Sequence, residues 1–324
     1  MKMQKENVLS VVFGHTVADA LGVPVEFCTR EELKQNPLKE MRGNGTYPVP
    51  AGSWSDDSSM SLASLDSLAS GNVDLDDHMQ KFVLWYIEGK YTPTGYPFDV
   101  GNTCALAIER YLFSKTPCTE CGLSGEYDNG NGSLMRMYPF VLYAMAKGYD
   151  DSSFFELIRM ASSITHAHPR SVIGCYIYAM ILKEILAKPS KESIALGLKK
   201  AEAYLLSHGI VEGQDYLNEM PHFQRVFSEN LPHMAEEEIC SSGYVVETLE
   251  ASLWCIFTTT SYETCVQKAV NLGDDTDTTA AVTGSIAGAL YGYHAIPFRW
   301  LNALQKREWI EELCERAYMT FQSF

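Results

Sequence analysis

The chain has 324 residues, of which 46% are hydrophobic and 20% are charged, so it can bury a large core. It carries 25 lysines and arginines against 41 aspartates and glutamates, which gives a formal net charge of −16. This excess of negative charge argues against a nucleic-acid backbone or an anionic membrane as the partner. An anionic ligand would have to be met by metal ions, backbone amides or a few placed side chains.

We expect a single domain over residues 1–324, because the sequence has no linker, charge block or low-complexity segment at which to divide it. The nine cysteines are scattered through apolar patterns, and the apolar run at 8–13 is too short for a signal peptide. We therefore expect reduced thiols and a cytoplasmic location. The pair Cys118 and Cys121 lacks a second pair or a histidine, which favours a chance loop pair over a zinc or redox site.

Apolar residues recur at helical spacing along the chain, while the alternation typical of strands is almost absent. In chain order the pattern predicts helices over 60–68, 79–87, 104–113, 172–187, 194–206, 245–258 and 263–272. Ser153 and Glu156 have the spacing of a capping box, which predicts that another helix opens there and continues through Met160. The fold class expected is all-α.

A run without formal charge at 279–298 is long enough to span a bilayer. It is only weakly hydrophobic, and it carries Gly284, Gly288 and Gly292 at every fourth position. We interpret it as a buried central helix whose glycine stripe lets neighbouring helices approach closely. No membrane is therefore expected as a partner.

Two acidic clusters stand directly before core-forming segments. The first is Ser55-Asp56-Asp57-Ser58, and the second is the Asp-Asp-Thr-Asp-Thr run at 274–278. Buried carboxylates are costly unless a cation neutralises them, yet the first cluster has no lysine or arginine nearby and the second has only Lys268. Carboxylate and hydroxyl oxygens favour Mg²⁺, Mn²⁺ or Ca²⁺ over zinc. If the two clusters meet in the fold, they form a site for one or two metal ions.

A competing interpretation makes the clusters simple helix caps. Aspartate and threonine are good N-cap residues, and carboxylates are favoured at a helix N-terminus, with Lys268 as a loose counter-charge for the second cluster. A calcium-binding EF-hand loop is excluded, because Ala280 occupies the sixth position, where that loop needs glycine.

At this point the sequence resembles the ADP-ribosylglycohydrolases, the family typified by dinitrogenase reductase-activating glycohydrolase and the ADP-ribosylhydrolases. The resemblance is carried in the family's order by blocks at 14–27 (GHTVADALGVPVEF), 52–60 (GSWSDDSSM), 99–103 (DVGNT), 131–139 (NGSLMRMYP) and 272–292 (LGDDTDTTAAVTGSIAGALYG). The Thr165-His166 pair matches the family as well. The most specific feature is the pair of acidic blocks with the NGSLMR block between them.

The resemblance implies a compact multi-helix bundle with a binuclear centre of two Mg²⁺ (or Mn²⁺) ions in a cleft. The implied metal ligands are Ser55, Asp56, Asp57, Asp275, Asp277 and Thr278. The carboxylates with an implied catalytic role are Glu26, Asp57, Asp99 and Asp277. The implied contacts to ADP-ribose are Asn102, Gly132, Ser133, Met135, Arg136 and His166, with Arg136 and the backbone of 130–133 on the pyrophosphate.

The implied reaction is hydrolysis of the bond between C1″ of the distal ribose and an acceptor, on an ADP-ribosylated protein or a small ADP-ribose derivative. Arginine, serine and O-acetyl acceptors all stay open, and we expect the loops at 91–99 and 122–132 to select among them. Two alternatives also remain. One is an inactive relative that binds ADP-ribose or serves structurally, and the other is a two-metal phosphohydrolase.

The chain departs from the family pattern at a few positions. Ser55 and Ser58 keep a hydroxyl where threonine is usual, and Ala18 replaces a glycine. Asp274 replaces the second glycine of the usual Gly-Gly-Asp, which adds a carboxylate beside the expected metals. That carboxylate either changes the metal preference or points to solvent.

Several of the implied site residues also have a purely structural interpretation. Glu26 could be a surface residue after a helix, and Asp99 could cap the helix that begins near Thr103. Arg136 could form a buried ion pair with Asp99 or Glu126. His166 or His168 could be only a cap at the helix end marked by the following proline.

Overall fold

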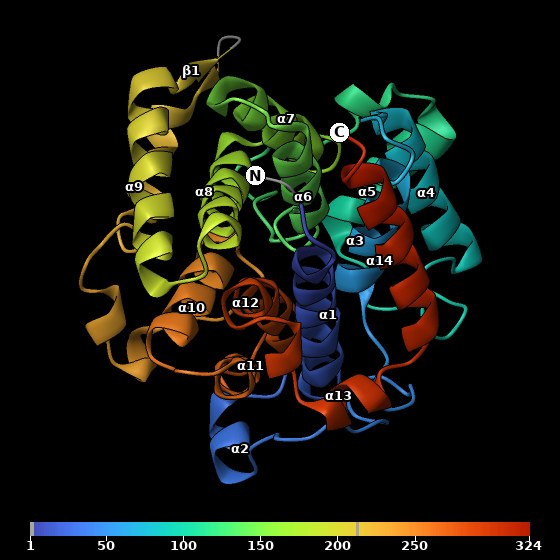
Figure 1. Cartoon of the computed structure of the whole chain (residues 1–324), viewed down its shortest axis with the longest axis vertical. Coiled ribbons are helices and arrows are strands. Elements are labelled where there is room, and N and C mark those ends of the chain that lie inside the picture. The colour runs from blue at the N-terminus through green and yellow to red at the C-terminus, as the bar shows by residue number, and fades with distance from the viewer. Residues whose placement is uncertain (1–2, 212–213) are drawn as a thin grey trace.

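Helices dominate the computed structural model, which describes residues 3–211 and 214–324 (Figure 1). The α-helices are α1 Lys5–Gly22, α2 Arg30–Gln35, α3 Asp56–Leu68, α4 Leu75–Glu88, α5 Asn102–Ser114, α6 Tyr138–Lys147, α7 Asp151–Ser163, α8 Pro169–Ala187, α9 Lys191–His208, α10 Val245–Phe257, α11 Tyr262–Val270, α12 Thr276–Tyr291, α13 Phe298–Ala303 and α14 Arg307–Phe321. Short 3₁₀ helices are η1 Val23–Val25, η2 Cys118–Glu120, η3 Tyr216–Phe223, η4 Leu231–His233, η5 Glu236–Glu238 and η6 Tyr293–Ala295. Within the described ranges, strand structure is limited to a small antiparallel ribbon of β1 Ile210–Val211 and β2 Gln214–Asp215.

The all-α prediction is confirmed, and each helix predicted from periodicity corresponds to one of α3, α4, α5, α8, α9, α10 and α11. The prediction for α7 was wrong at its start. This helix begins at Asp151, and the side chain of Asp150 caps it by accepting a hydrogen bond from the backbone N–H of Ser153 at 2.8 Å. Because Asp150 already supplies the cap, Ser153 lies inside the first turn and not at its N-cap.

The centre of the bundle is the contact between α1 and α12, which lie side by side (Figure 1). A Cβ placed on Gly284 would lie 2.2 Å from the carbonyl oxygen of Gly14, and one on Gly288 would lie 2.1 Å from that of Ser10. Two backbones can approach this closely only where side chains are missing. The predicted glycine stripe therefore holds for Gly284 and Gly288, while Gly292 ends α12 with a φ of +86°.

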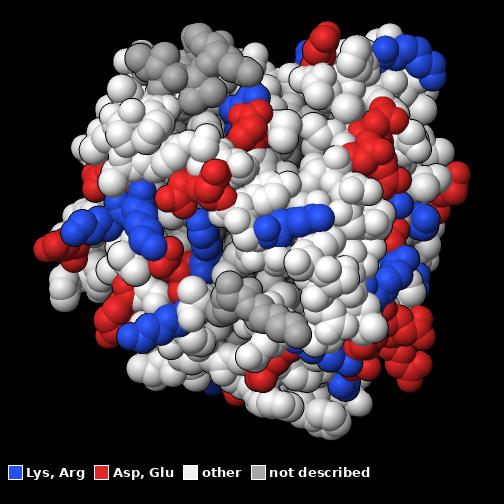
Figure 2. Space-filling view, turned by 45° about the horizontal axis from the view of Figure 1, so that its top comes forward, with Lys and Arg blue, Asp and Glu red and all other residues white. Residues whose placement is uncertain are grey.

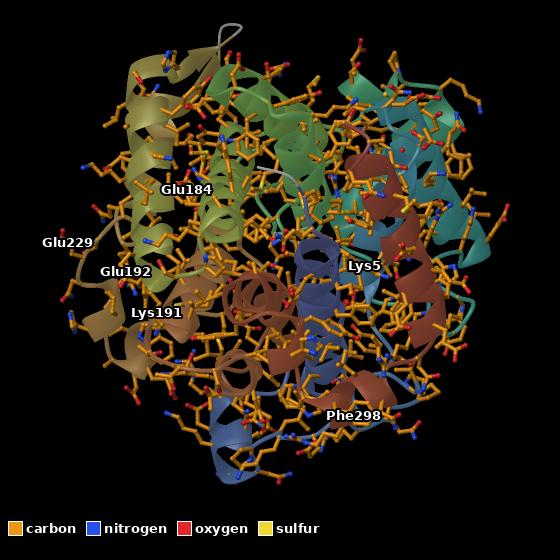
Figure 3. The ribbon with its side chains drawn as sticks, in the orientation of Figure 1. Lys5, Glu184, Lys191, Glu192, Glu229 and Phe298 are labelled. Carbon is orange, nitrogen blue, oxygen red and sulfur yellow. The ribbon has the colours of Figure 1, made fainter. Side chains whose placement is uncertain are left out.

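One segment of the described chain, Lys5–Val25, is long and apolar enough to cross a membrane by length and composition, and 94% of its apolar 18-residue window is buried inside the bundle. The uncharged run at 279–298 begins within α12, whose residues from Thr276 to Ala289 are buried. Side chains fill the space between these helices, as Figure 3 shows, and the core includes the fully buried indoles of Trp54, Trp85 and Trp300. On the face drawn in Figure 2, acidic and basic side chains are interspersed and no broad basic area is visible.

Adding one methyl group at the α1–α12 contact tests how tightly it is packed. We expect Gly284→Ala to destabilise the protein by about 3 kcal/mol, because its Cβ would meet backbone atoms that cannot move away. The matched control is Gly148→Ala, which has open space around it but a φ of +70°, and should cost only about 1 kcal/mol. Urea unfolding measures both, and equal losses for the two variants would contradict the packing argument.

Candidate functional site

The first acidic cluster forms the N-terminus of α3 and is held there by a residue of α1. Ser55 is the N-cap, and its hydroxyl accepts a hydrogen bond from the Asp57 N–H at 3.3 Å. The buried carboxylate of Asp19 accepts four hydrogen bonds, from the N–H and hydroxyl of Ser55 (both 3.0 Å) and from those of Ser58 (3.0 and 2.5 Å). The first turn of α3 is thereby fixed to α1.

The second cluster forms the N-terminus of α12. Asp275 is the N-cap, and its carboxylate accepts hydrogen bonds from the Thr278 N–H at 3.3 Å and from Nδ2 of Asn131 at 2.8 Å. The hydroxyl of Thr276 donates to the carbonyl oxygen of Gly22 at the end of α1, at 2.9 Å. Both acidic helix starts are therefore anchored to the same central helix.

The two clusters meet, as the sequence predicted. The hydroxyl of Thr278, at the start of α12, donates a hydrogen bond to Oδ1 of Asp57, at the start of α3, at 3.2 Å. Carboxylate oxygens of Asp19, Asp57 and Asp277 lie within 4.8 Å of one another, and so do those of Glu26, Asp99 and Asp277. Asp277 belongs to both groups and lies between them.

This arrangement leaves buried carboxylate oxygens without partners. Oδ2 of Asp57, Oδ2 of Asp277 and Oε2 of Glu26 are buried and accept no hydrogen bond within the described part of the chain. Lys268 does not neutralise them, because its ammonium lies 3.7 Å above the Trp254 ring and donates to Thr258. Unpartnered hard oxygens in this number fit a divalent cation such as Mg²⁺ or Mn²⁺. The interpretation of the clusters as mere solvated caps is wrong, because Asp57 and Asp277 are fully buried.

Burial and mutual repulsion raise the pKa values of the whole group. Desolvation lifts the pKa of Asp57 and that of Asp277 well above the ordinary range, and neighbouring carboxylates add to the effect. For Asp19 burial outweighs its hydrogen bonds and raises the pKa to about 7. For Glu26 burial, followed by the charge of Asp99, raises the pKa to about 9. Without a cation, burial and the neighbouring carboxylates therefore favour the protonated forms of these groups.

Glu26 and Asp99 form a second acidic pair at the edge of the site. Glu26 is only 5% exposed, so its interpretation as a surface residue is wrong. Asp99 accepts a hydrogen bond from the hydroxyl of Tyr47 at 2.9 Å and adopts a left-handed backbone with φ of +53°. It does not cap α5, because the N-cap there is Gly101 and no side chain serves as a cap. Strained backbone of this kind is concentrated at functional sites.

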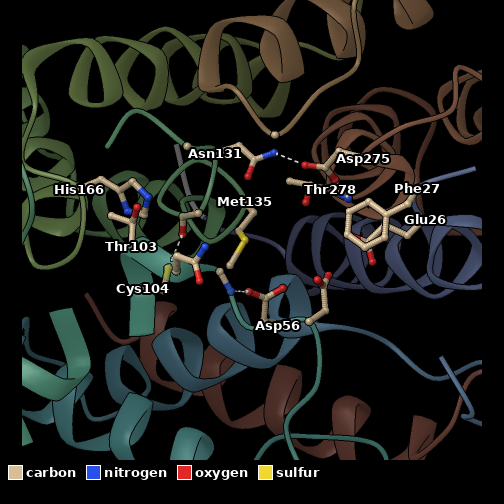
Figure 4. A pocket seen from close by; sticks show the side chains of 16 residues that line it. Glu26, Phe27, Asp56, Thr103, Cys104, Asn131, Met135, His166, Asp275 and Thr278 are labelled. Atoms are coloured by element: carbon tan, nitrogen blue, oxygen red, sulfur yellow. Dashed lines mark hydrogen bonds between the residues drawn. The ribbon is translucent and has the colours of Figure 1, made fainter. Parts of the chain in front are cut away.

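Above the carboxylates lies a cavity of about 380 Å³ (Figure 4). The predicted residues that line it are Glu26, Asp56, Asp99, Asn102, Gly132, Met135, His166, Asp275 and Thr278. Asp57 and Asp277 are fully buried and do not line it. In Figure 4 His166 and Cys104 stand at one end of the cavity, and Glu26 and Phe27 stand at the other. The cavity thus extends from the Gly130–Gly132 loop to the acidic pair.

Two predicted ligand contacts, Ser133 and Arg136, do not line this cavity. Both are fully buried in the core. Arg136 donates to the hydroxyl of Thr165 at 2.8 Å, and its guanidinium lies 5.1 Å from the centre of the Phe82 ring. The proposed ion pair of Arg136 with Asp99 or Glu126 is not formed either, since Glu126 pairs with Arg170 at 2.9 Å. In the 131–136 block, Gly132 and Met135 face the cavity whereas Ser133 and Arg136 face the core.

His166 and His168 have different positions, although they are two residues apart. His166 lines the cavity, and its Nδ1 lies 2.8 Å from the hydroxyl of Thr165. Burial and the charge of Arg136 lower the pKa of His166 to about 3, so its ring is neutral. His168 is the N-cap of α8 and accepts the Arg170 N–H at 3.2 Å. The cap interpretation therefore holds for His168 only.

The sequence interpretation assigned no role to three residues that orient the side chains of the site. Asp19 orients both serines of the first cluster, Asn131 links Asp275 to Thr248, and Tyr47 holds Asp99. Asp19 had a signal, because a carboxylate inside an otherwise apolar helix needs a partner. Asn131 belongs to a recognised block but was not assigned a role. Tyr47 lies in an irregular segment and had no signal.

Comparisons with known proteins show what the chain is similar to. The profile of a family described as ADP-ribosylglycohydrolase matches residues 2–323. A protein of Serratia proteamaculans (strain 568) named ADP-ribosylarginine hydrolase Tri1 is 33% identical over 320 residues, 97% of this chain and 79% of the relative. The ADP-ribosyl-[dinitrogen reductase] glycohydrolase of Rhodospirillum rubrum is 31% identical over 305 residues, 93% of this chain and 91% of the relative. A solved structure named ADP-ribosylglycohydrolase-related protein complex matches with a TM-score of 0.78 and 32% identity, covering 98% of each chain.

The raised pKa values predict that the metal-free protein loses stability as the pH rises. Each carboxyl ionises near pH 4 in the unfolded chain, but in the folded protein only at about 7 for Asp19 and about 9 for Glu26. The stability that these two carboxyls contribute to the folded protein is complete below about pH 4, and it is lost as the pH rises through their folded-state pKa values. We expect the Tm in EDTA to fall from about pH 5 to about pH 9, and Mg²⁺ to restore several degrees at the alkaline end.

Asp57→Asn tests the effect of one buried negative charge on the Tm, because it removes the charge and keeps the shape of the side chain. It keeps an oxygen that accepts from Thr278, so we expect a higher Tm than wild type in EDTA at alkaline pH and no further rise with Mg²⁺. The matched control is Asp151→Asn on α7, which removes an exposed ion pair with Lys183 and should change the stability by less than about 0.5 kcal/mol. A wild-type Tm that depends on neither pH nor Mg²⁺ would refute the assignment of these carboxylates to a metal site.

Asp19 is predicted to position the first cluster. In Asp19→Asn, an amide N–H group would face the groups that now donate hydrogen bonds to the carboxylate. We therefore expect a loss of about 2–3 kcal/mol in unfolding free energy and about tenfold weaker Mg²⁺ binding. Ser58→Ala removes only one of the side-chain hydrogen bonds and should cost about 1 kcal/mol. Calorimetry gives both quantities, and unchanged Mg²⁺ affinity in Asp19→Asn would contradict the positioning role.

Proposed function

The chain belongs to the ADP-ribosylglycohydrolase family and is a hydrolase of the ADP-ribose glycosidic linkage, and we propose that it works with two divalent cations, Mg²⁺ or Mn²⁺. We propose an ADP-ribosylated protein, or a small ADP-ribose derivative, as the substrate. Relatives named for hydrolysis of ADP-ribosylarginine and of ADP-ribosylated dinitrogen reductase support a protein substrate. The observation that carries the proposal is the set of buried, unpartnered carboxylate oxygens beside the cavity.

The proposed ligands come from the two acidic helix starts. Those from α3 are Ser55, Asp56 and Asp57, and those from the start of α12 are Asp275, Asp277 and Thr278. When bound, the cations would supply positive charge that keeps these carboxylates ionised, and Lewis acidity toward the hydroxyls of the distal ribose. Asp19 keeps its oxygens on Ser55 and Ser58, so we assign it to positioning and not to the metal, although it lies within reach.

Proton movement is assigned to Glu26 and Asp99. Cleavage at C1″ passes through an oxocarbenium-like state that nearby negative charge stabilises, and the acceptor must leave with a proton. Tyr47 donates a hydrogen bond to Asp99, whereas Oε2 of Glu26 has no partner and burial raises the pKa of Glu26 to about 9, so Glu26 is the carboxyl that holds a proton. Glu26 would therefore donate to the leaving acceptor, and Asp99 would take a proton from the attacking water.

The diphosphate would lie at the other end of the cavity. The lining residues in the described chain include no lysine or arginine, and Arg136 is turned into the core. Anion binding there would rely on the backbone amides at the N-terminus of α5, which begins with Asn102, and on the Gly130–Gly132 loop. A Cβ on Gly132 would lie 2.9 Å from the His166 ring, so only glycine lets the backbone and the imidazole both face a ligand.

A cytoplasmic location is also part of the proposal. All nine cysteines are free thiols in the structure, and several of them are buried with raised pKa values that keep them protonated. Unoxidised thiols in such number are typical of a reducing compartment.

The first test is ADP-ribose release from arginine-, serine- and O-acetyl-linked substrates, each with Mg²⁺, with EDTA and with Asp277→Asn. We expect Mg²⁺-dependent release from one acceptor class and a loss of about 10³-fold or more in the variant, because Asp277 joins both carboxylate groups. Asp151→Asn should keep wild-type activity. Release that persists in EDTA would reject the metal, ADP-ribose binding without release would support the inactive alternative, and phosphate release from nucleotides would support the phosphohydrolase.

A further inference from the structure

Two residues with left-handed backbones meet at the edge of the cavity. Phe27 and Asp274 both have a φ of +63°, a conformation that is uncommon for aspartate and an outlier for a bulky aromatic residue. The Phe27 N–H donates to the carbonyl of Asp274 at 2.7 Å, and the Asp274 N–H donates to that of Cys28 at 2.9 Å. The strained residues are therefore held together as one unit, far apart in sequence but adjacent in space.

These two residues separate the cavity from a second pocket of about 460 Å³, the rim pocket, which is lined by segment 27–30, Ser241, Ser242, Glu247 and Asp274 among others. Phe27 lines both the cavity and the rim pocket. Its side chain is 64% exposed, although Phe is an apolar residue with a core close at hand. Asp274 is exposed in the rim pocket and does not line the cavity, so it points away from the carboxylates that would hold metal.

Two carboxylates of the rim pocket, those of Asp274 and Glu247, have no basic partner within the described residues. Arg30 is occupied by the carbonyl oxygens of Leu272, Glu236 and Ile239, at 2.8, 2.5 and 2.6 Å. Glu237 pairs with Lys34, and Glu247 accepts a hydrogen bond from Ser242. Within the described residues, the Asp274 carboxylate has no hydrogen-bond or ion-pair partner. An unpaired carboxylate therefore lies beside an exposed aromatic face.

The position of this pair relative to the proposed reaction indicates what it binds. If the diphosphate lies on the Gly130–Gly132 loop, the distal ribose reaches the carboxylates and its acceptor leaves past Glu26. In Figure 4 Phe27 stands beside Glu26, at the end of the cavity away from His166. Because Phe27 also lines the rim pocket, that pocket adjoins this end of the cavity. This step rests on the proposed function, because it uses the orientation of ADP-ribose given there.

We propose that Phe27 and Asp274 form an acceptor subsite that selects a guanidinium, as on an ADP-ribosylated arginine side chain. A guanidinium is planar and cationic, so it stacks on an aromatic ring and is attracted to a carboxylate at the same time. A serine or acetyl acceptor has neither property. The pair therefore discriminates among acceptors and leaves the ADP-ribose part of the substrate untouched.

The test uses ADP-ribosyl-agmatine, a small guanidinium-linked substrate, with Phe27→Leu and Asp274→Asn. Leucine keeps apolar bulk without the ring, and asparagine keeps the shape and the tolerance for positive φ without the charge. We expect each change to lower kcat/KM by about tenfold, mainly through KM, and the two together to lower it further. The Ki of free ADP-ribose, which leaves the acceptor subsite empty, should stay within about twofold of wild type.

Matched controls are Phe298→Leu, an exposed phenylalanine at the start of α13 (Figure 3), and Asp151→Asn on α7. Neither residue lines the cavity or the rim pocket, so both variants should behave as wild type. If Phe27→Leu fails to fold, Phe27→Gly replaces it, because glycine adopts positive φ without strain.

The possible failures are distinguishable. Unchanged kcat/KM for the agmatine compound in both variants overturns the subsite. A rise in the Ki of ADP-ribose as large as the fall in kcat/KM also overturns it, because the pair would then belong to the ADP-ribose site. A wild-type protein that hydrolyses a serine- or O-acetyl-linked substrate but not the agmatine compound overturns the guanidinium preference while the hydrolase function stands. No release from any linkage means that the proposed function itself fails.

Discussion

The structure depends on one costly feature, which is the burial of several carboxylates beside one another with no basic side chain between them in the described chain. Asp57 and Asp277 have no exposed surface, and each keeps an oxygen without a partner. Helix N-termini supply part of the compensation, because their free amides favour negative charge. That term is worth about 1 kcal/mol for a cap, far less than the penalty of an ionised buried carboxylate. The remainder has to come from protons or from a bound cation, and this choice couples the fold to pH and to metal.

The α1–α12 contact is what keeps these repelling groups in place. Glycines remove the side chains between the helices, so that a Cβ on Gly22 would lie 2.5 Å from Cα of Asp277. At the same junction the Thr276 hydroxyl bonds to the Gly22 carbonyl, and Asp19 on α1 holds the start of α3. The segment after α1 carries Glu26 and Phe27, and it pairs with Asp274 just before α12. A single helix crossing therefore places both acidic clusters, Glu26 and the rim residues, which explains why the glycines and the acids occur in the same short blocks.

Much of this could be predicted from sequence, for identifiable reasons. Apolar periodicity located seven of the fourteen α-helices in the described chain. The two acidic clusters before core segments had no cation nearby, which indicated that they meet in the fold. The failures are equally specific. Arg136 belongs to a block in which Gly132 and Met135 face the cavity, but the direction of a side chain within a tight turn depends on backbone angles that composition does not reveal. Asp19 was assigned no role, because its partners, Ser55 and Ser58, are distant in sequence. Acceptor selection by the loops at 91–99 and 122–132 stays a prediction. The pairing of Phe27 with Asp274 could not be predicted, because it forms only through long-range backbone hydrogen bonds.

The absence of basic residues from the cavity lining has a consequence for the order of binding. ADP-ribose carries two negative phosphates, and the described cavity offers them amides and a neutral histidine but several carboxylates nearby. Like charges in a water-poor cleft repel strongly. If the proposed cations bind first, they neutralise the carboxylates and the approach of the diphosphate no longer meets a negative field. By linkage, the substrate must then strengthen cation binding by the same factor. An acidic protein with a net charge of −16 can thus recognise an anionic ligand, provided that the cations arrive before it or with it.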